Sequence, residues 1–157
     1  MQNKMKMNQM TESEITEFLE KAPVGRIATQ NENGFPYIAP IHFVYYNQKI
    51  YIHGLPKGQK IDNILAHPKV GFEIDQMDGL NISAERKAAC GIGTYYSSVI
   101  ILGNAKMVDD ADLKDKVLRL TVEKYVPDYP KIPFGVMIEK TGIIEIEIVE
   151  CTGKRRK

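Results

Sequence analysis

The chain has no excess of charge of either sign. Lysine and arginine total 21 and aspartate and glutamate total 20, which gives a formal net charge of +1 over 157 residues. Proteins that grip a nucleic-acid backbone usually carry a basic excess, so no nucleic-acid partner is expected. The chain also lacks a run of about 20 apolar residues, the length that a membrane-spanning helix needs. We therefore expect neither nucleic acid nor a membrane as a partner.

Cysteine is also scarce, with Cys90 and Cys151 as the only two. They are too few for a disulfide framework, and their spacing is not that of zinc ligands. Free thiols are typical of a reducing compartment, so we expect a cytoplasmic protein. Arg86 and Lys87 lie close enough in sequence to activate Cys90, although a small core residue is the simpler interpretation.

The length suits one domain with a sizeable core. We expect that domain over residues 11–154, between a flexible leader at 1–10 and a basic tail at 155–157. The leader has positive charge but no apolar segment behind it, so it is not expected to be a signal peptide.

Three helices are predicted from apolar spacing and capping residues. Thr11 and Glu14 have the spacing of a capping box, and apolar residues recur behind them every three or four positions. A short helix is expected around residues 61–65. A third begins after Asp110 and ends near Tyr125, shortly before a proline.

Alternating apolar residues predict about seven strands. The expected strands span residues 24–30, 36–46, 49–53, 69–75, 94–108, 134–139 and 143–149. Their connections are mostly too short for parallel crossovers, so the sheet is expected to be antiparallel. Six or more such strands most easily bury their apolar faces by closing into a barrel, which predicts a mainly β fold with flanking helices.

Two irregular features are expected within this sheet. Residues 76–93 have no clear period and are interpreted as a long loop. Gly103 lies inside the longest predicted strand, where a glycine is typical of a bulge.

Familiar catalytic motifs are absent, including the nucleotide-binding glycine loops, the zinc-protease helix motif and the hydrolase nucleophile turn. The histidines His42, His53 and His67 fall on separate predicted elements, so no metal site is expected. The informative segment leads from His53 through a glycine-containing loop into a helix that begins beside Lys57 and Lys60. Free amides and positive charge at a helix N-terminus suit a phosphate, although on pattern alone a solvated loop is the favoured interpretation.

Two further candidates come from polar residues in apolar strands. The guanidinium of Arg26 is costly in a short apolar strand unless it is paired or exposed. Ser97 and Ser98 interrupt another apolar strand, where their hydroxyls either face solvent or donate to a ligand.

Seven stretches occur in a recognisable order. They are GRIAT at 25–29, GFPYIAPIHFVY at 34–45, IYIHG at 50–54, GQKIDNI at 58–64, HPKV at 67–70, YYSSVIILGNA at 95–105 and IVECTGK at 148–154. Together they resemble the pyridoxamine 5'-phosphate oxidase-like split-barrel flavoproteins, and within that superfamily the 5-nitroimidazole-resistance (Nim) group.

The resemblance implies a homodimeric split β-barrel with FMN in a groove at the subunit interface. It assigns the phosphate to Arg26, Gln59 and Lys60, and contacts with the flavin ring to Pro40, Ile41, Ile52 and His53. By the same resemblance Ile27, Ala28 and Thr29 run beside the flavin and its ribityl chain, and Ser98 reaches the cofactor.

The activity implied is FMN-dependent reduction of small electron-poor substrates such as nitroimidazoles. His53 is the candidate catalytic residue, for substrate contact or proton delivery. Pyridoxamine-phosphate oxidase activity itself is not expected, because the chain ends without that enzyme's arginine-containing extension. Two alternatives stay open: a haem- or flavin-binding module without turnover, with His53 as an axial ligand, and a phosphate-ligand binder with no redox role.

Overall fold

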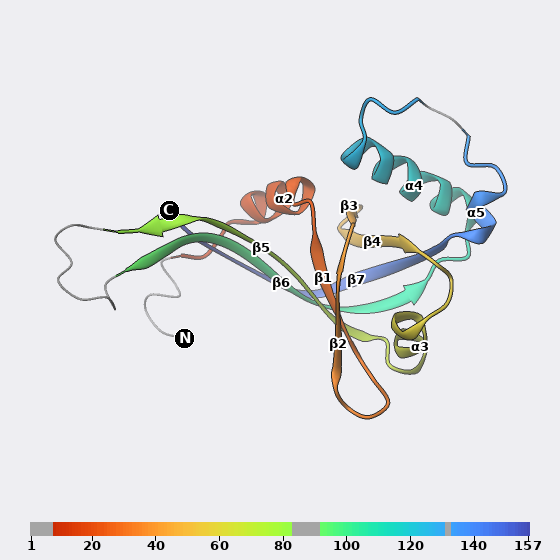
Figure 1. Cartoon of the computed structure of the whole chain (residues 1–157), viewed down its shortest axis with the longest axis horizontal. Helices are drawn as coiled ribbons and strands as arrows, with labels where there is room; N and C mark the ends of the chain where they lie inside the picture. Colours follow the sequence, from red (N-terminus) through yellow and green to blue (C-terminus); the bar gives the residue numbers. More distant parts are fainter. Residues whose placement is uncertain (1–7, 83–91, 131–132) are drawn as a thin grey trace.

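A computed structural model describes residues 8–82, 92–130 and 133–157 of the chain. One antiparallel sheet of seven strands, in the order β2-β1-β5-β6-β7-β4-β3, carries helices on its surface (Figure 1). The strands are β1 (Gly25–Gln30), β2 (Pro36–Ile41), β3 (Val44–Tyr46), β4 (Lys49–Gly54), β5 (Lys69–Asn81), β6 (Gly93–Met107) and β7 (Gly142–Arg156). The helices are α2 (Glu12–Lys21), α3 (Gln59–Ala66), α4 (Ala111–Tyr125) and α5 (Met137–Lys140).

The sheet curls around one apolar core and carries a second core on its outside. Alternate residues of β1, β4, β5, β6 and β7 point inward, and Ile27, Ile74 and Ile101 are completely buried there. On the other face of β4 and β7, α4 covers a smaller cluster that includes Tyr51 and Ile143. The expected mainly β split barrel with flanking helices is thus confirmed.

The single strand expected at residues 36–46 is in fact two strands with different partners. β2 pairs with β1 as far as Ile41, which lies opposite Gly25, and β3 begins its pairing with β4 at Val44. His42 and Phe43 belong to neither ladder. The alternating pattern could not reveal this, because it continues unbroken while the hydrogen-bonding partner changes.

The hydroxyl of Tyr125, at the end of α4, replaces the missing strand partner. It accepts a hydrogen bond from the Phe43 amide and donates one to the Phe43 carbonyl, both at 3.0 Å. The Tyr125 ring also stacks on the His42 ring, with centroids 4.3 Å apart and an interplanar angle of 21°. Backbone groups that leave a ladder must be bonded elsewhere when they are buried, and this helix end satisfies them.

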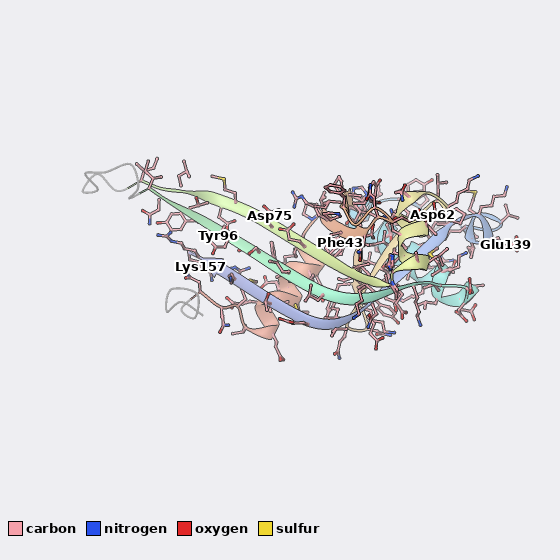
Figure 2. All side chains as sticks on the ribbon, turned by 90° about the horizontal axis from the view of Figure 1, so that it is seen from below. Phe43, Asp62, Asp75, Tyr96, Glu139 and Lys157 are labelled. Atoms are coloured by element: carbon pink, nitrogen blue, oxygen red, sulfur yellow. The ribbon has the colours of Figure 1, made fainter. Side chains whose placement is uncertain are left out.

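The long loop expected at residues 76–93 is wrong at its two ends. β5 continues to Asn81 and β6 starts at Gly93, so the two strands form an arm that projects past α2 (Figure 1). Figure 2 shows Asp75 and Tyr96 on the two strands of this arm, with Lys157 beside them after the end of β7. The period is lost there because many arm residues are exposed and because the register shifts between Met77 and Gly79. Residues 83–91, which include Cys90, lie outside the described residues.

Two expectations near the C-terminus are also corrected. Residues 134–139 do not form a strand, since the four-residue helix α5 occupies Met137–Lys140. The basic tail expected at 155–157 is largely strand, because β7 runs to Arg156 and pairs with Tyr96 of β6. The bulge predicted at Gly103 is confirmed by a register shift between Leu102 and Gly103.

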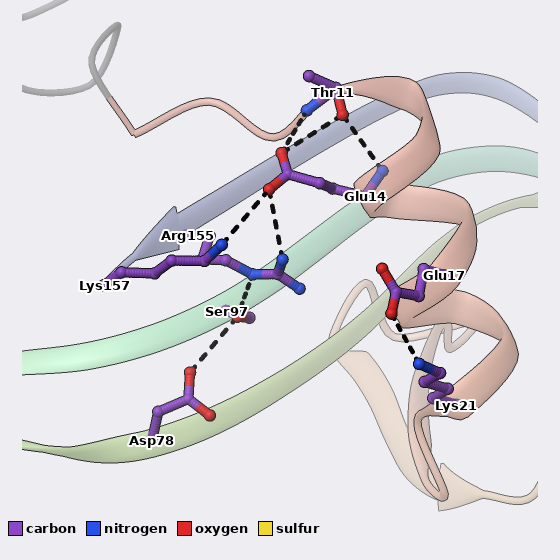
Figure 3. Close-up of polar contacts among 8 residues, drawn as sticks. All are labelled: Thr11, Glu14, Glu17, Lys21, Asp78, Ser97, Arg155 and Lys157. Atoms are coloured by element: carbon purple, nitrogen blue, oxygen red, sulfur yellow. Dashed lines mark hydrogen bonds and ion pairs between the residues drawn. The ribbon is translucent and has the colours of Figure 1, made fainter.

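The start of α2 is bonded to the end of β7 (Figure 3). The capping box is confirmed: the Thr11 hydroxyl accepts from the Glu14 amide, and the Glu14 carboxylate accepts from the Thr11 amide at 3.0 Å. Arg155 donates to Glu14 at 3.4 Å and to Ser97 at 2.9 Å. Just before the helix, the Met10 amide donates to the Gly153 carbonyl at 3.0 Å, so the last part of the expected leader is paired with the sheet.

A buried carboxylate, that of Glu145 on β7, is surrounded by donors. Lys49 and Tyr51 donate to it at 2.8 and 2.9 Å, and Lys106 lies 3.3 Å away. Burial alone would raise the pKa of Glu145, but these hydrogen bonds and charges outweigh it and hold the pKa below its usual value. The ionised carboxylate therefore stabilises the fold, and this contribution is lost as pH falls through the pKa of the folded state.

We predict that Glu145→Ala lowers the free energy of unfolding by about 3 kcal/mol, because it leaves two lysines around an empty, buried position. Glu147→Ala is the matched control, since Glu147 lies on the same strand and is exposed. Its effect should stay within about 0.5 kcal/mol. Urea denaturation at neutral pH measures both. Equal effects of the two substitutions would show that the network contributes nothing.

Candidate functional site

The N-terminus of α3 is open and faces a cleft. Gly58 is the N-cap residue, with a positive φ of 121° and no side chain to bond the first amides of the helix. The Ile61 and Asp62 amides donate back to the Gly58 carbonyl, which leaves those of Gln59 and Lys60 at the open end. A cleft of about 250 Å³ lies here, lined by Tyr37, Leu55, Lys57, Gly58, Gln59, Lys60 and Ile61. Free amides at a helix start favour an anion.

Lys60 brings a full charge to this cleft without a compensating partner. Its side chain is half-buried, and burial lowers its pKa. No carboxylate within the described part of the chain forms an ion pair with it. A partly buried, unpaired ammonium is stabilised by any anion that enters the cleft, so the electrostatics of α3 and of Lys60 point to the same ligand chemistry.

A polar network fixes α3 against the end of β1. The side-chain amide of Asn63 donates to Thr29 and to Asn31, each at 2.9 Å, and accepts from Gln59 at 2.8 Å. Asn63 is 2% exposed, which makes it a buried polar residue whose bonds are satisfied. Sequence reasoning missed this residue, although an asparagine on the apolar face of a short helix is a usable sign.

His53 is the last side chain of β4 before the loop that leads to α3. It lies opposite Ile143 of β7 and is half-buried. Burial is the largest cause that lowers its pKa, followed by the positive fields of His42 and Lys60. His53, His42 and Lys60 are thus electrostatic neighbours, and His53 is neutral at pH 7.

Arg26 lies elsewhere, on the outer face of β1. It forms ion pairs with Glu73, at 3.1 Å, and with Asp75, both on β5. Thr29, which touches α3 through Asn63, is three residues further along and on the opposite face of β1, about 10 Å away along the strand. Within one chain the structure does not bring Arg26 and Lys60 into a common pocket.

The other residues that the resemblance assigns to the flavin lie either inside the barrel or on its outer face. The side chains of Ile27, Thr29 and Ile52 are at most 2% exposed and point into the barrel, so only their backbone can meet a ligand. Ile41 packs against the barrel core. The outer face carries the rest, namely Ala28, Pro40 and Ser98, together with Arg26.

The structure therefore contains two groups of candidate residues. The α3 group consists of His53, Gln59 and Lys60, where an open helix start and a lysine lie near a neutral histidine. The outer-face group consists of Arg26, Ala28, Pro40 and Ser98. Among the described residues, no cluster of three or more histidine, cysteine or acidic side chains has the geometry of a metal site.

Comparison with protein families gives one match, to the model described as pyridoxamine 5'-phosphate oxidase, over residues 11–155. The chain belongs to this family. Among curated proteins, none shows a significant sequence match.

None of the described helices is long and apolar enough to cross a membrane.

Several solved structures share the fold at low sequence identity. The flavocytochrome Anf3 from Azotobacter vinelandii superimposes with a TM-score of 0.84 and 22% identity, over 100% of this chain and 72% of that one. A candidate 5-nitroimidazole antibiotic resistance protein from Bacteroides thetaiotaomicron gives a TM-score of 0.76 and 19% identity, over 93% of this chain and 85% of that one. The FAD and heme binding protein from Mycobacterium smegmatis gives a TM-score of 0.83 and 15% identity, over 96% of this chain and 74% of that one.

We predict that His53 makes the protein less stable in mild acid. Because its pKa is lowered in the folded state, stability is lost as pH falls from about 6.5 through the pKa of the folded protein. Urea unfolding of the parent and of His53→Gln at pH 7.5 and pH 5 measures this, and the variant should lose less stability between the two. His67→Gln, at the exposed C-cap of α3, is the control and should lose as much stability between pH 7.5 and pH 5 as the parent does.

Proposed function

We propose that the protein is an FMN-dependent oxidoreductase that reduces small electron-poor substrates such as nitroimidazoles. The observation that carries the proposal is Lys60, whose ammonium has no ion-pair partner among the described residues. It lies at the open N-terminus of α3, near the neutral His53. A cofactor phosphate fits this cleft, because it can accept from the free amides and neutralise the ammonium. Family membership and the flavin-binding names of several structural relatives support the same cofactor class.

The chain's residues then have separate roles. Lys60 and the α3 amides hold the phosphate, and Gln59, tied to Asn63, keeps the helix start in place. Bound flavin supplies the electron transfer, which explains why the site needs no triad or carboxylate pair. His53 contacts the substrate or delivers a proton to it, since a neutral imidazole can donate and accept near pH 7.

We further propose that two chains form a homodimer through the outer face of the sheet. Register places Pro40, Arg26, Glu73 and Ile100 in one row and Ile38, Ala28, Gly71 and Leu102 in the next. Ile38, Ile100 and Leu102 are 61%, 52% and 50% exposed, so this face carries three exposed apolar side chains around the Arg26–Glu73 ion pair that a second copy would cover. In such a dimer Arg26 and Ser98 of one chain can approach the α3 group of the other. A cytoplasmic location is part of the same proposal.

A second candidate function is haem binding with His53 as axial ligand. His53 is half-buried and neutral, as a ligating histidine must be, and two structural relatives are described as a flavocytochrome and a heme-binding protein. The absorption spectrum of the purified protein separates the two candidates. Flavin gives paired bands in the blue and near ultraviolet, haem gives one intense Soret band, and a colourless protein that takes up neither cofactor would contradict both.

We predict that Lys60→Met weakens FMN binding by about tenfold or more, since one charge-assisted contact to a phosphate is worth roughly 1.5–3 kcal/mol. Quenching of flavin fluorescence during titration of the apoprotein measures the affinity. Lys140→Met is the matched control, because Lys140 is exposed on α5, and it should bind FMN as the parent does. Equal affinity of Lys60→Met and the parent would remove the phosphate from this cleft.

A separate prediction concerns the dimer. Ile100→Glu adds a negative charge beside Glu73 on the outer face and should convert dimers into monomers, with loss of bound flavin if the site is shared. Light scattering coupled to gel filtration, with absorbance at the flavin band, measures both quantities. Leu65→Glu, at an exposed position on α3 away from the outer face of the sheet, should leave the dimer intact. A parent that is monomeric and still retains flavin would contradict the shared site.

A further inference from the structure

A second histidine, His42, lies near His53. β3 and β4 pair as far as Val44, opposite Tyr51, so His42 and His53 each lie two residues beyond this last pair. Phe43 and Ile52, between that pair and the histidines, both belong to the barrel core. The positive field of His42 on His53 agrees with this arrangement. The resemblance-based list of site residues did not include His42.

The His42 ring is held in place rather than free in solvent. It stacks on the Tyr125 ring at 4.3 Å, and the Tyr125 hydroxyl is bonded to both backbone groups of Phe43, the next residue. Tyr125 therefore fixes the backbone beside His42 and also the plane of its ring. His42 is exposed whereas His53 is half-buried, so His42 is the solvent-side member of the pair.

The charged and titratable groups around the pair come from three elements. Lys60 of α3 acts on His53, and Tyr125 of α4 lies against His42. The Lys124 ammonium lies 3.9 Å from the Phe43 ring centroid and 5.5 Å from the Tyr125 ring centroid, and it donates to the Leu19 carbonyl at 3.2 Å. On β7, the Glu145 carboxylate is occupied by Lys49, Tyr51 and Lys106. No carboxylate in the described ranges bonds either histidine, and the two charged groups whose fields act on His53 are His42 and Lys60.

We propose that His42 is a second proton-carrying residue of the site, which passes protons from solvent to His53, and that Tyr125 positions it. The inference rests on the proposed redox function for the destination of the proton. Reduction of a nitro group to a nitroso group takes up two electrons, from the reduced flavin, and two protons, and it releases one water. Each proton that the neutral, half-buried His53 gives up from one ring nitrogen must be replaced at the other, and the exposed His42 supplies that route from solvent.

The first test does not depend on flavin. The imidazole protons of the full-length protein are followed by NMR from pH 4.5 to 8.5 in the parent, His42→Asn and His67→Asn. Removal of a like-charged neighbour should raise the titration midpoint of His53 by about half a unit in His42→Asn. His67→Asn is the matched control and should leave that midpoint where it is. An unchanged midpoint in His42→Asn would overturn the inference, whatever the protein does with flavin.

The second test measures proton delivery in the flavin-loaded protein. His42→Asn should lower turnover of a nitroaromatic by about tenfold, and added imidazole should restore it, because the lost group is exposed. Loss of turnover without rescue would make His42 a structural residue and contradict the relay. Failure of the parent to bind flavin would instead contradict the proposed function, and the NMR result would still stand for the histidine pair.

The role of Tyr125 is tested by two substitutions. Tyr125→Phe keeps the ring stack and removes the bonds to Phe43, and Tyr125→Leu removes both. If Tyr125 positions His42, the His53 midpoint should shift upward in Tyr125→Leu and by less in Tyr125→Phe, with flavin affinity unchanged in each. A shift in neither variant, with both folded by circular dichroism, would show that His42 needs no positioning by α4.

Discussion

The exchange of strand partners at His42 and Phe43 is the constraint on which the rest of the site depends. β2 must follow β1 while β3 must follow β4, so the chain leaves one ladder and enters another within two residues. The Phe43 amide and carbonyl, which that step leaves without a strand partner, are both bonded by the Tyr125 hydroxyl. The docking of α4 is therefore coupled to this exchange of strand partners, and the exchange sets where His42 lies relative to His53.

The residue before Tyr125 strengthens the same junction. The Lys124 ammonium lies 3.9 Å from the centroid of the Phe43 ring and donates to the Leu19 carbonyl near the end of α2. Burial lowers the pKa of Lys124 to about 8, with Glu20 opposing the shift. Contact with the face of an aromatic ring favours the charged form, so the cation joins α4, α2 and the barrel core at one point. The end of α4 thus acts through two adjacent side chains with different chemistry.

Local features of the fold could be predicted from the sequence wherever one residue type has one structural use. The capping box at Thr11, the bulge at Gly103 and the end of α4 at Tyr125 are of this kind. The extension of β5 from Gln76 to Asn81 was missed, because a mostly exposed strand lacks the apolar alternation that predicts strands. The split at His42 was missed because alternation reports which face a side chain takes and not which strand its backbone bonds.

The same distinction explains why the candidate site was only partly predictable. Arg26 and Lys60 are both basic residues in apolar surroundings, and only the structure separates their environments. Arg26 has two carboxylates beside it and is compensated within its own chain. Lys60 has none in the described ranges and lies half-buried at an open helix start. A dianionic ligand gains more from the uncompensated cation, since binding there breaks no existing ion pair. Lys60 is accordingly the better anchor for a phosphate, and Arg26 is better placed to shape the face on which a second chain would lie.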